Sequence, residues 1–132
     1  MIVLDASAVV KWFLREKESE EMKLLLEKII SKEFEVHVPE LLFLEVANVL
    51  RYAKLSEEDV IEGIKALMIL DFSVHGFKEL FEDAVEIAFE KGLTIYDSVY
   101  LALSMKLGAV LVTYDSILLK FGGKKASDLI RL

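Results

Sequence analysis

The stretch Leu107-Gly-Ala-Val-Leu-Val-Thr-Tyr-Asp115 decides the fold class of this chain. Residues 109–113 within it are the clearest strand, because apolar and β-branched residues run together between a glycine and polar residues. Helical patterns flank this strand at residues 94–107 and 115–121. A strand set between helices in this way predicts an α/β fold with a parallel sheet.

The same alternation extends to the N-terminus, with no linker rich in Gly, Ser or Pro, and predicts a single domain over residues 1–132. A sheet of four or five strands is expected, and its further strands are predicted at residues 2–4, 34–38, 72–75 and 129–130. Further helices are predicted at residues 6–15, 18–31, 39–54, 56–70 and 77–91. Pro39 is expected in the first turn of its helix, and Gly92 and Gly108 just past two helix ends.

The composition limits what the protein can be. The chain is 55% hydrophobic and 30% charged, which excludes a disordered chain. It contains no Cys, which excludes disulfides, thiol catalysis and Cys-ligated zinc, and its two His leave little for a histidine-rich metal site. No uncharged run exceeds eight residues, whereas a membrane-spanning helix needs about 20. Because no basic region precedes the first apolar residues, we expect a cytoplasmic protein.

The charge of the chain is strongly acidic. Sixteen basic residues against 23 acidic ones give a net charge of −7, which at first argues against a protein that coats nucleic acid. Most of the acids lie beside Lys on amphipathic helices, where we expect them to be solvated. Four acids lie among apolar residues instead, and these are Asp5, Glu45, Asp97 and Asp115.

Three of these acids are placed at the ends of predicted elements. Asp5 and Asp115 each follow a strand, and ligands of open parallel sheets bind outside the carboxyl ends of the strands. Asp97 stands at the start of an apolar helix, three residues after Thr94. Each of the three, taken alone, also fits a purely structural role at a helix N-terminus, Asp97 as part of a capping box.

Glu45 is the only charged residue between residues 41 and 50. An ionised carboxylate in apolar surroundings needs a partner, and Asn48 on the same helical face could hold it, as could a base such as Arg51. If helices cover both faces of the sheet, all four acids can meet in one crevice. Four carboxylates there need a cation, because like charges raise each other's pKa. Oxygen ligands favour Mg²⁺ or Mn²⁺, and such a site supports phosphodiester hydrolysis by metal-activated water.

With these residues in place, the sequence resembles the PIN domain family, and in particular the VapC-type ribonuclease toxins of prokaryotic toxin–antitoxin pairs. The resemblance covers essentially the whole chain, with its motifs in the family's order and spacing. It is carried by Val3-Leu-Asp-Ala-Ser7, Pro39-Glu-Leu-Leu-Phe-Leu-Glu-Val-Ala-Asn-Val-Leu50, Tyr96-Asp-Ser-Val-Tyr-Leu-Ala-Leu103 and Leu111-Val-Thr-Tyr-Asp115.

The resemblance implies a three-layer α/β/α fold and an endoribonuclease that depends on Mg²⁺ or Mn²⁺. The acids expected to be catalytic and to bind the metal are Asp5, Glu45, Asp97 and Asp115. The residues expected to support these ligands from behind are Ser7 and Thr113, to which the helical spacing adds Asn48. The expected partners are an RNA substrate, a cognate antitoxin protein and a second copy of the chain in a homodimer.

Two other functions stay open at this point. One is a catalytically silent binding module with the same fold. The other is a receiver-type signalling domain, which also binds Mg²⁺ through acids at strand ends. A receiver domain predicts paired acids after the first strand, whereas Asp5 is followed by Ala6.

The remaining polar and aromatic residues have weaker patterns. We expect His37 to be an ordinary strand residue, and Trp12 to be a core or dimer contact. Lys11, Arg15 and Arg51 are the bases that could edge a cleft for RNA, although solvation at the surface is the commoner role. The acidic charge therefore predicts that a metal ion, rather than a basic face, attracts the RNA.

Overall fold

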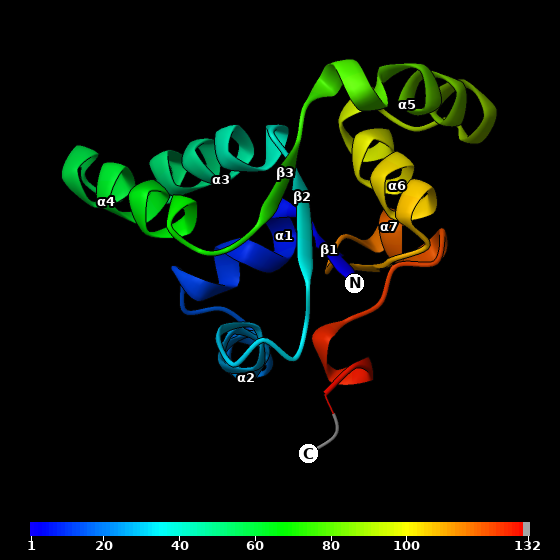
Figure 1. Ribbon diagram of the computed structural model, residues 1–132. Coiled ribbons are helices and arrows are strands. Elements are labelled where there is room, and N and C mark those ends of the chain that lie inside the picture. Colours follow the sequence, from blue (N-terminus) through cyan, green and yellow to red (C-terminus); the bar gives the residue numbers. More distant parts are fainter. Residues whose placement is uncertain (131–132) are drawn as a thin grey trace.

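A four-stranded parallel sheet forms the centre of the computed structural model, which describes residues 1–130 (Figure 1). Its strands are β1 (Ile2–Leu4), β2 (Val36–Pro39), β3 (Ser73–His75) and β4 (Val110–Val112). They lie in the order β3-β2-β1-β4, and every neighbouring pair is parallel. The α/β class and the parallel sheet predicted from the sequence are confirmed.

Helices cover both faces of this sheet. In Figure 1, α3 and α4 lie to one side of the strands and α5 and α6 to the other, which gives the expected three layers. The helices are α1 (Ala6–Val9), α2 (Ser19–Ile30), α3 (Leu41–Tyr52), α4 (Glu57–Met68), α5 (Phe77–Lys91), α6 (Ile95–Leu107) and α7 (Ser116–Lys120), with 3₁₀ turns η1 (Val10–Trp12) and η2 (Ala126–Asp128). In the part of the chain described, no helix combines the length and the apolar character that crossing a membrane requires.

The core is built on the two central strands. All three residues of β1 are buried, and α6, which packs against β1, β2 and β4, is buried from Ser98 to Ser104. A helix buried on this many sides needs apolar residues on several faces, which explains the long apolar run after Asp97. Gly92 and Gly108 end α5 and α6 in the left-handed conformation, as their positions in the sequence predicted.

Three predicted elements differ in the structure. The helix predicted at residues 6–15 is only one α-helical turn, α1, followed by the 3₁₀ turn η1. Pro39 is the last residue of β2 rather than the first turn of α3, because it pairs with His75 and the chain next donates from Glu40 N to His75 O, at 2.8 Å. Residues 129–130 form no strand, since the sheet edge beside β4 is taken by a bridge between Val112 and Lys124.

Candidate active site

Asp5 is the most deeply buried of the four predicted acids. Asp5 is the residue directly after β1 and is only 3% exposed. Oδ1 accepts hydrogen bonds from Ser7 Oγ at 2.7 Å and from Ala8 N at 3.0 Å, so Asp5 is also the N-cap of α1. Oδ2 accepts from Thr113 Oγ1 at 2.6 Å. The structural interpretation of Asp5 as an N-cap is therefore confirmed, and its role as a metal ligand stays a prediction.

Two hydroxyl groups join the carboxyl ends of β1 and β4. Ser7 Oγ accepts a hydrogen bond from Tyr114 N at 2.8 Å and lies 3.3 Å from Thr113 Oγ1. Thr113 Oγ1 in turn accepts from Asp115 N at 3.0 Å. Because both hydroxyls donate to Asp5 and accept from the chain after β4, they fix the position of its carboxylate relative to Asp115.

Asp115 and Asp97 lie at the starts of helices in different ways. Asp115 is the N-cap of α7, where Oδ1 accepts from Ile117 N at 2.9 Å and Leu118 N at 3.0 Å. Asp97 lies in the first turn of α6, whose N-cap is Thr94. Thr94 Oγ1 accepts from Asp97 N at 3.1 Å, whereas the Asp97 carboxylate accepts no hydrogen bond from the described residues. The side chain of Asp97 is therefore available for a ligand.

Glu45 lies on α3 and is held by a residue that the sequence analysis did not assign. Its Oε1 accepts a hydrogen bond of 2.5 Å from the phenol of Tyr100, which is only 2% exposed on α6. The predicted bond from Asn48 is not formed, because the buried face of α3 carries Val46 and Leu50 and leaves Asn48 exposed. The sequence feature that could have identified this partner of Glu45 is the phenol of Tyr100, on an apolar helix three residues after Asp97.

The sequence of almost the whole chain matches a known protein family. Residues 2–124 match the family model described as PIN domain. The chain belongs to the PIN domain family. A curated relative, Ribonuclease VapC3 of Pyrobaculum aerophilum, is 33% identical over 120 residues, which cover 86% of this chain and 88% of the relative.

Two solved structures show the same fold as this PIN domain. Mycobacterium tuberculosis VapC20, a toxin that cleaves the sarcin–ricin loop, matches with a TM-score of 0.76 and 16% identity over 95% of this chain and 98% of its own. A toxin–antitoxin complex from Klebsiella pneumoniae matches with a TM-score of 0.63 and 17% identity over 88% of each chain. At these identities the similarity is evidence for the fold alone.

Electrostatic coupling links the four carboxylates of this PIN domain. Burial, with a smaller contribution from the charge of Asp115, raises the pKa of Asp5 to about 6, against the bonds from Thr113 and Ser7. Burial also raises the pKa of Asp97, with a second contribution from Asp115. The pKa of Glu45 is raised by burial and by Asp97, against the bond from Tyr100. Asp115 therefore lies close enough to Asp5 and Asp97, and Asp97 close enough to Glu45, to oppose ionisation of those side chains.

These couplings stop short of a formed metal centre. Among residues 1–130, no three His, Asp or Glu side chains are arranged closely enough to hold an ion. Asp5 follows β1, Glu45 lies on α3, Asp97 lies on α6 and Asp115 follows β4. This PIN domain thus gathers the predicted acids in one region, and which of them bind a metal stays a prediction.

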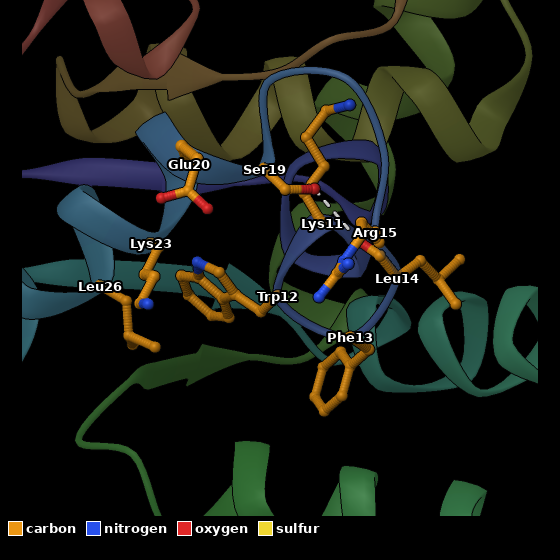
Figure 2. A pocket seen from close by; sticks show the side chains of 9 residues that line it. All are labelled: Lys11, Trp12, Phe13, Leu14, Arg15, Ser19, Glu20, Lys23 and Leu26. Carbon is orange, nitrogen blue, oxygen red and sulfur yellow. Dashed lines mark hydrogen bonds between the residues drawn. The ribbon is translucent and has the colours of Figure 1, made fainter.

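A surface pocket of about 440 Å³ lies over η1 and the start of α2 (Figure 2). Lys11 contributes to its lining, yet its Nζ donates to Lys17 O at 2.7 Å and lies 4.7 Å from the centre of the Tyr114 ring. Trp12 donates from Nε1 to Met22 O at 2.7 Å and is partly buried against the core, which confirms the predicted core contact. Lys11 is therefore held by Lys17 and the Tyr114 ring, while Arg15 lines the same pocket.

Proposed function

We propose that this protein is a metal-dependent endoribonuclease of the VapC toxin type, which hydrolyses phosphodiester bonds of RNA. The observation that carries the proposal is the chain of charge effects that links Asp5 to Asp115, Asp115 to Asp97 and Asp97 to Glu45, in a protein 33% identical to a VapC ribonuclease. Membership of the PIN domain family removes the receiver-type signalling domain from the alternatives. A catalytically silent module with this fold remains the competing function.

The donor atoms of the site fit a hard divalent cation. The proposed ligands, Asp5, Glu45, Asp97 and Asp115, offer only carboxylate oxygen, and oxygen ligands favour Mg²⁺ or Mn²⁺. The raised pKa values of Asp5, Glu45 and Asp97 also favour a bound cation. Carboxylates that resist ionisation near one another are stabilised most by a nearby positive charge. When bound, such an ion supplies a more acidic water molecule and stabilises negative charge on the phosphate.

The chain itself positions these ligands. Ser7 and Thr113 donate to both oxygens of Asp5 and hold its carboxylate in one orientation. Tyr100 donates to Oε1 of Glu45 and leaves Oε2 for a ligand. The Asp97 carboxylate accepts no hydrogen bond among the described residues, so no such bond has to break when it binds an ion. We expect the products to be a 3′-hydroxyl and a 5′-phosphate, by analogy with the family.

Two protein partners belong to this proposal. The first is a cognate antitoxin, and the net charge of −7 favours an antitoxin segment rich in Lys and Arg. The second is another copy of the chain. An apolar groove of about 600 Å³ between α3, α5 and α6 is partly formed by Leu44 and Tyr96, which are 70% and 61% exposed. This groove is the proposed contact between the two copies. Light scattering of wild type and Leu44→Glu tests it, because a charge in the groove should dissociate the dimer.

An RNA cleavage assay with matched variants tests the activity. Wild type is incubated with a structured RNA in Mn²⁺, in Mg²⁺ and in chelator, beside Asp5→Asn, Asp97→Asn and the control Asp83→Asn, an exposed acid of α5. We expect cleavage in metal only, at least about 100-fold slower in the two site variants and unchanged in the control. Cleavage that survives chelator, or both site variants, would contradict the proposal. A folded wild type with no cleavage of any RNA would favour the silent module.

A further inference from the structure

A row of four titratable side chains lies where β2 and β3 meet α5. Nδ1 of His37 faces Nε2 of His75 at 2.8 Å. The other ring nitrogens each face a carboxylate: His37 Nε2 lies 2.9 Å from Glu35 Oε2, and His75 Nδ1 lies 2.6 Å from Glu79 Oε2. We call these four residues the histidine row. None of them is among the charges that raise the pKa values of Asp5, Glu45 and Asp97.

The strand register builds the row. His37 is level with Ser73 of β3, and His75 is level with Pro39 of β2. The two His are therefore diagonal neighbours, and residues two apart along a strand share a face, which places Glu35 on the side of His37. Glu79 follows His75 by four residues and lies in the first turn of α5. Two strands and one helix thus contribute to one cluster.

The hydrogen bonds of the histidine row leave no proton for the contact between its two inner ring nitrogens. Carboxylates only accept, so the outer nitrogen of each ring must carry a proton. The pKa of Glu79 is lowered, mainly by its bond with His75, which fits an ionised acceptor there. A neutral imidazole carries one proton, so both inner nitrogens then present lone pairs to each other at 2.8 Å. Two lone pairs at this distance repel unless a cation lies between them.

We propose that His37 and His75 together bind one late first-row divalent ion, of the class of Zn²⁺, Ni²⁺ and Cu²⁺. Neutral imidazole nitrogen suits these ions, and a carboxylate on the outer nitrogen is the usual support of a metal-binding His. The two side chains are 12% and 16% exposed, so water can complete the coordination. Nitrogens about 2.0–2.1 Å from a tetrahedral ion are about 3.3 Å apart, so the rings need to open by about 0.5 Å.

This site differs in chemistry from the four carboxylates. It offers nitrogen to the ion, whereas the proposed active site offers oxygen, so Mg²⁺ should not compete for the histidine row. Lys106 Nζ lies 3.8 Å from Glu79 Oε2 and, with the ion, balances the two carboxylates of the row. Because His37 belongs to β2 and His75 to the edge strand β3, an ion shared between them would fasten that edge. The expected effect is on the stability of the fold rather than on catalysis.

Thermal unfolding with ZnCl2 tests the site. The full chain is stripped with chelator, dialysed into 5 mM MgCl2 at about pH 7.5 to occupy the oxygen ligands, and titrated with ZnCl2. We expect one Zn²⁺ per chain, and a melting temperature raised by about 5 °C or more at about 100 times the dissociation constant. His37→Asn and His75→Asn should lose this response, while Asp97→Asn should keep it.

The opposite results are equally clear. No response in wild type would leave a shared proton as the cation of the row and overturn the proposal, as would an equal response in His37→Asn. If neither His variant folds, a spectrum of the wild type with bound Cu²⁺ still tests the proposal. The paramagnetic resonance spectrum of one bound Cu²⁺ should show coupling to two nitrogens, and a spectrum from oxygen ligands only would also overturn the proposal.

Discussion

Replacing Tyr100 by Phe removes one oxygen atom from the candidate active site and leaves the ring in place. The lost atom donates the 2.5 Å hydrogen bond to Glu45 Oε1, from a side chain that is 2% exposed. A hydrogen bond to a charged group contributes about 1.5–3 kcal/mol, but half-buried Glu45 can recruit water, so we expect a loss of stability of about 1–2 kcal/mol. The larger effect concerns the ligand, because the carboxylate is no longer held in one orientation.

The assay for Tyr100→Phe separates these two effects. Urea denaturation in chelator gives the change in stability, and calorimetric titration with Mn²⁺ gives the affinity of the site. Removing a group that orients a metal ligand typically costs 10–100-fold in affinity or activity, and we expect a loss in that range. Tyr52→Phe is the matched control on the helix that carries Glu45, since Tyr52 is 75% exposed. A Tyr100→Phe protein with the Mn²⁺ affinity and cleavage rate of wild type would refute the role given to this bond.

Three further predictions concern Asp5 and its supports. The pKa of Asp5 rises from 3.8 to about 6 on folding, so the folded state binds the extra proton and wild type loses stability as pH rises from about 4 to 6. In urea denaturation with chelator, the free energy of unfolding of Asp5→Asn relative to wild type should therefore increase over that interval, by at most about 3 kcal/mol. A difference between the two proteins that does not change with pH would contradict this. Thr113→Val should cost about 1–3 kcal/mol in the same assay, because Asp5 Oδ2 and Asp115 N both lose a partner, whereas Thr113→Ser should cost less than 1 kcal/mol. Gly123→Ala should be destabilising by about 1–3 kcal/mol, since a Cβ there would lie 2.4 Å from Thr113 Cγ2, while Gly76→Ala, with no atom within 4 Å, should stay within about 1 kcal/mol.

The sequence allowed the sheet to be predicted because its signals are local. The run at residues 109–113 and the glycines after α5 and α6 act through neighbouring residues, and the structure agrees with all of them. Pro39 was misplaced because its role depends on pairing with His75 of another strand, which no local pattern encodes. The strand predicted at residues 129–130 failed for a similar reason, since Lys124 already bridges to β4.

The candidate site shows the same division. The four acids could be singled out because a charge among apolar residues is visible in the sequence. Thr113, which bonds to Asp5 across 108 residues, was expected only through the resemblance to the family, and Tyr100, which bonds to Glu45 across 55 residues, was not expected at all. Asn48 was chosen as the partner of Glu45 from helical spacing, which says that two residues share a face but not whether that face is exposed. The histidine row was missed because it depends on the diagonal register of β2 and β3.

The proposed function requires that Asp5, Glu45, Asp97 and Asp115 form one oxygen-ligated metal site. Diffraction from crystals soaked in Mn²⁺, recorded with anomalous scattering, tests this most directly because it locates the ion without reference to activity. We predict an anomalous peak among these carboxylates, in contact with at least two of them, and its loss in Asp97→Asn crystals. A well-diffracting crystal with no peak there, or with Mn²⁺ bound only at His37 and His75, would contradict the account.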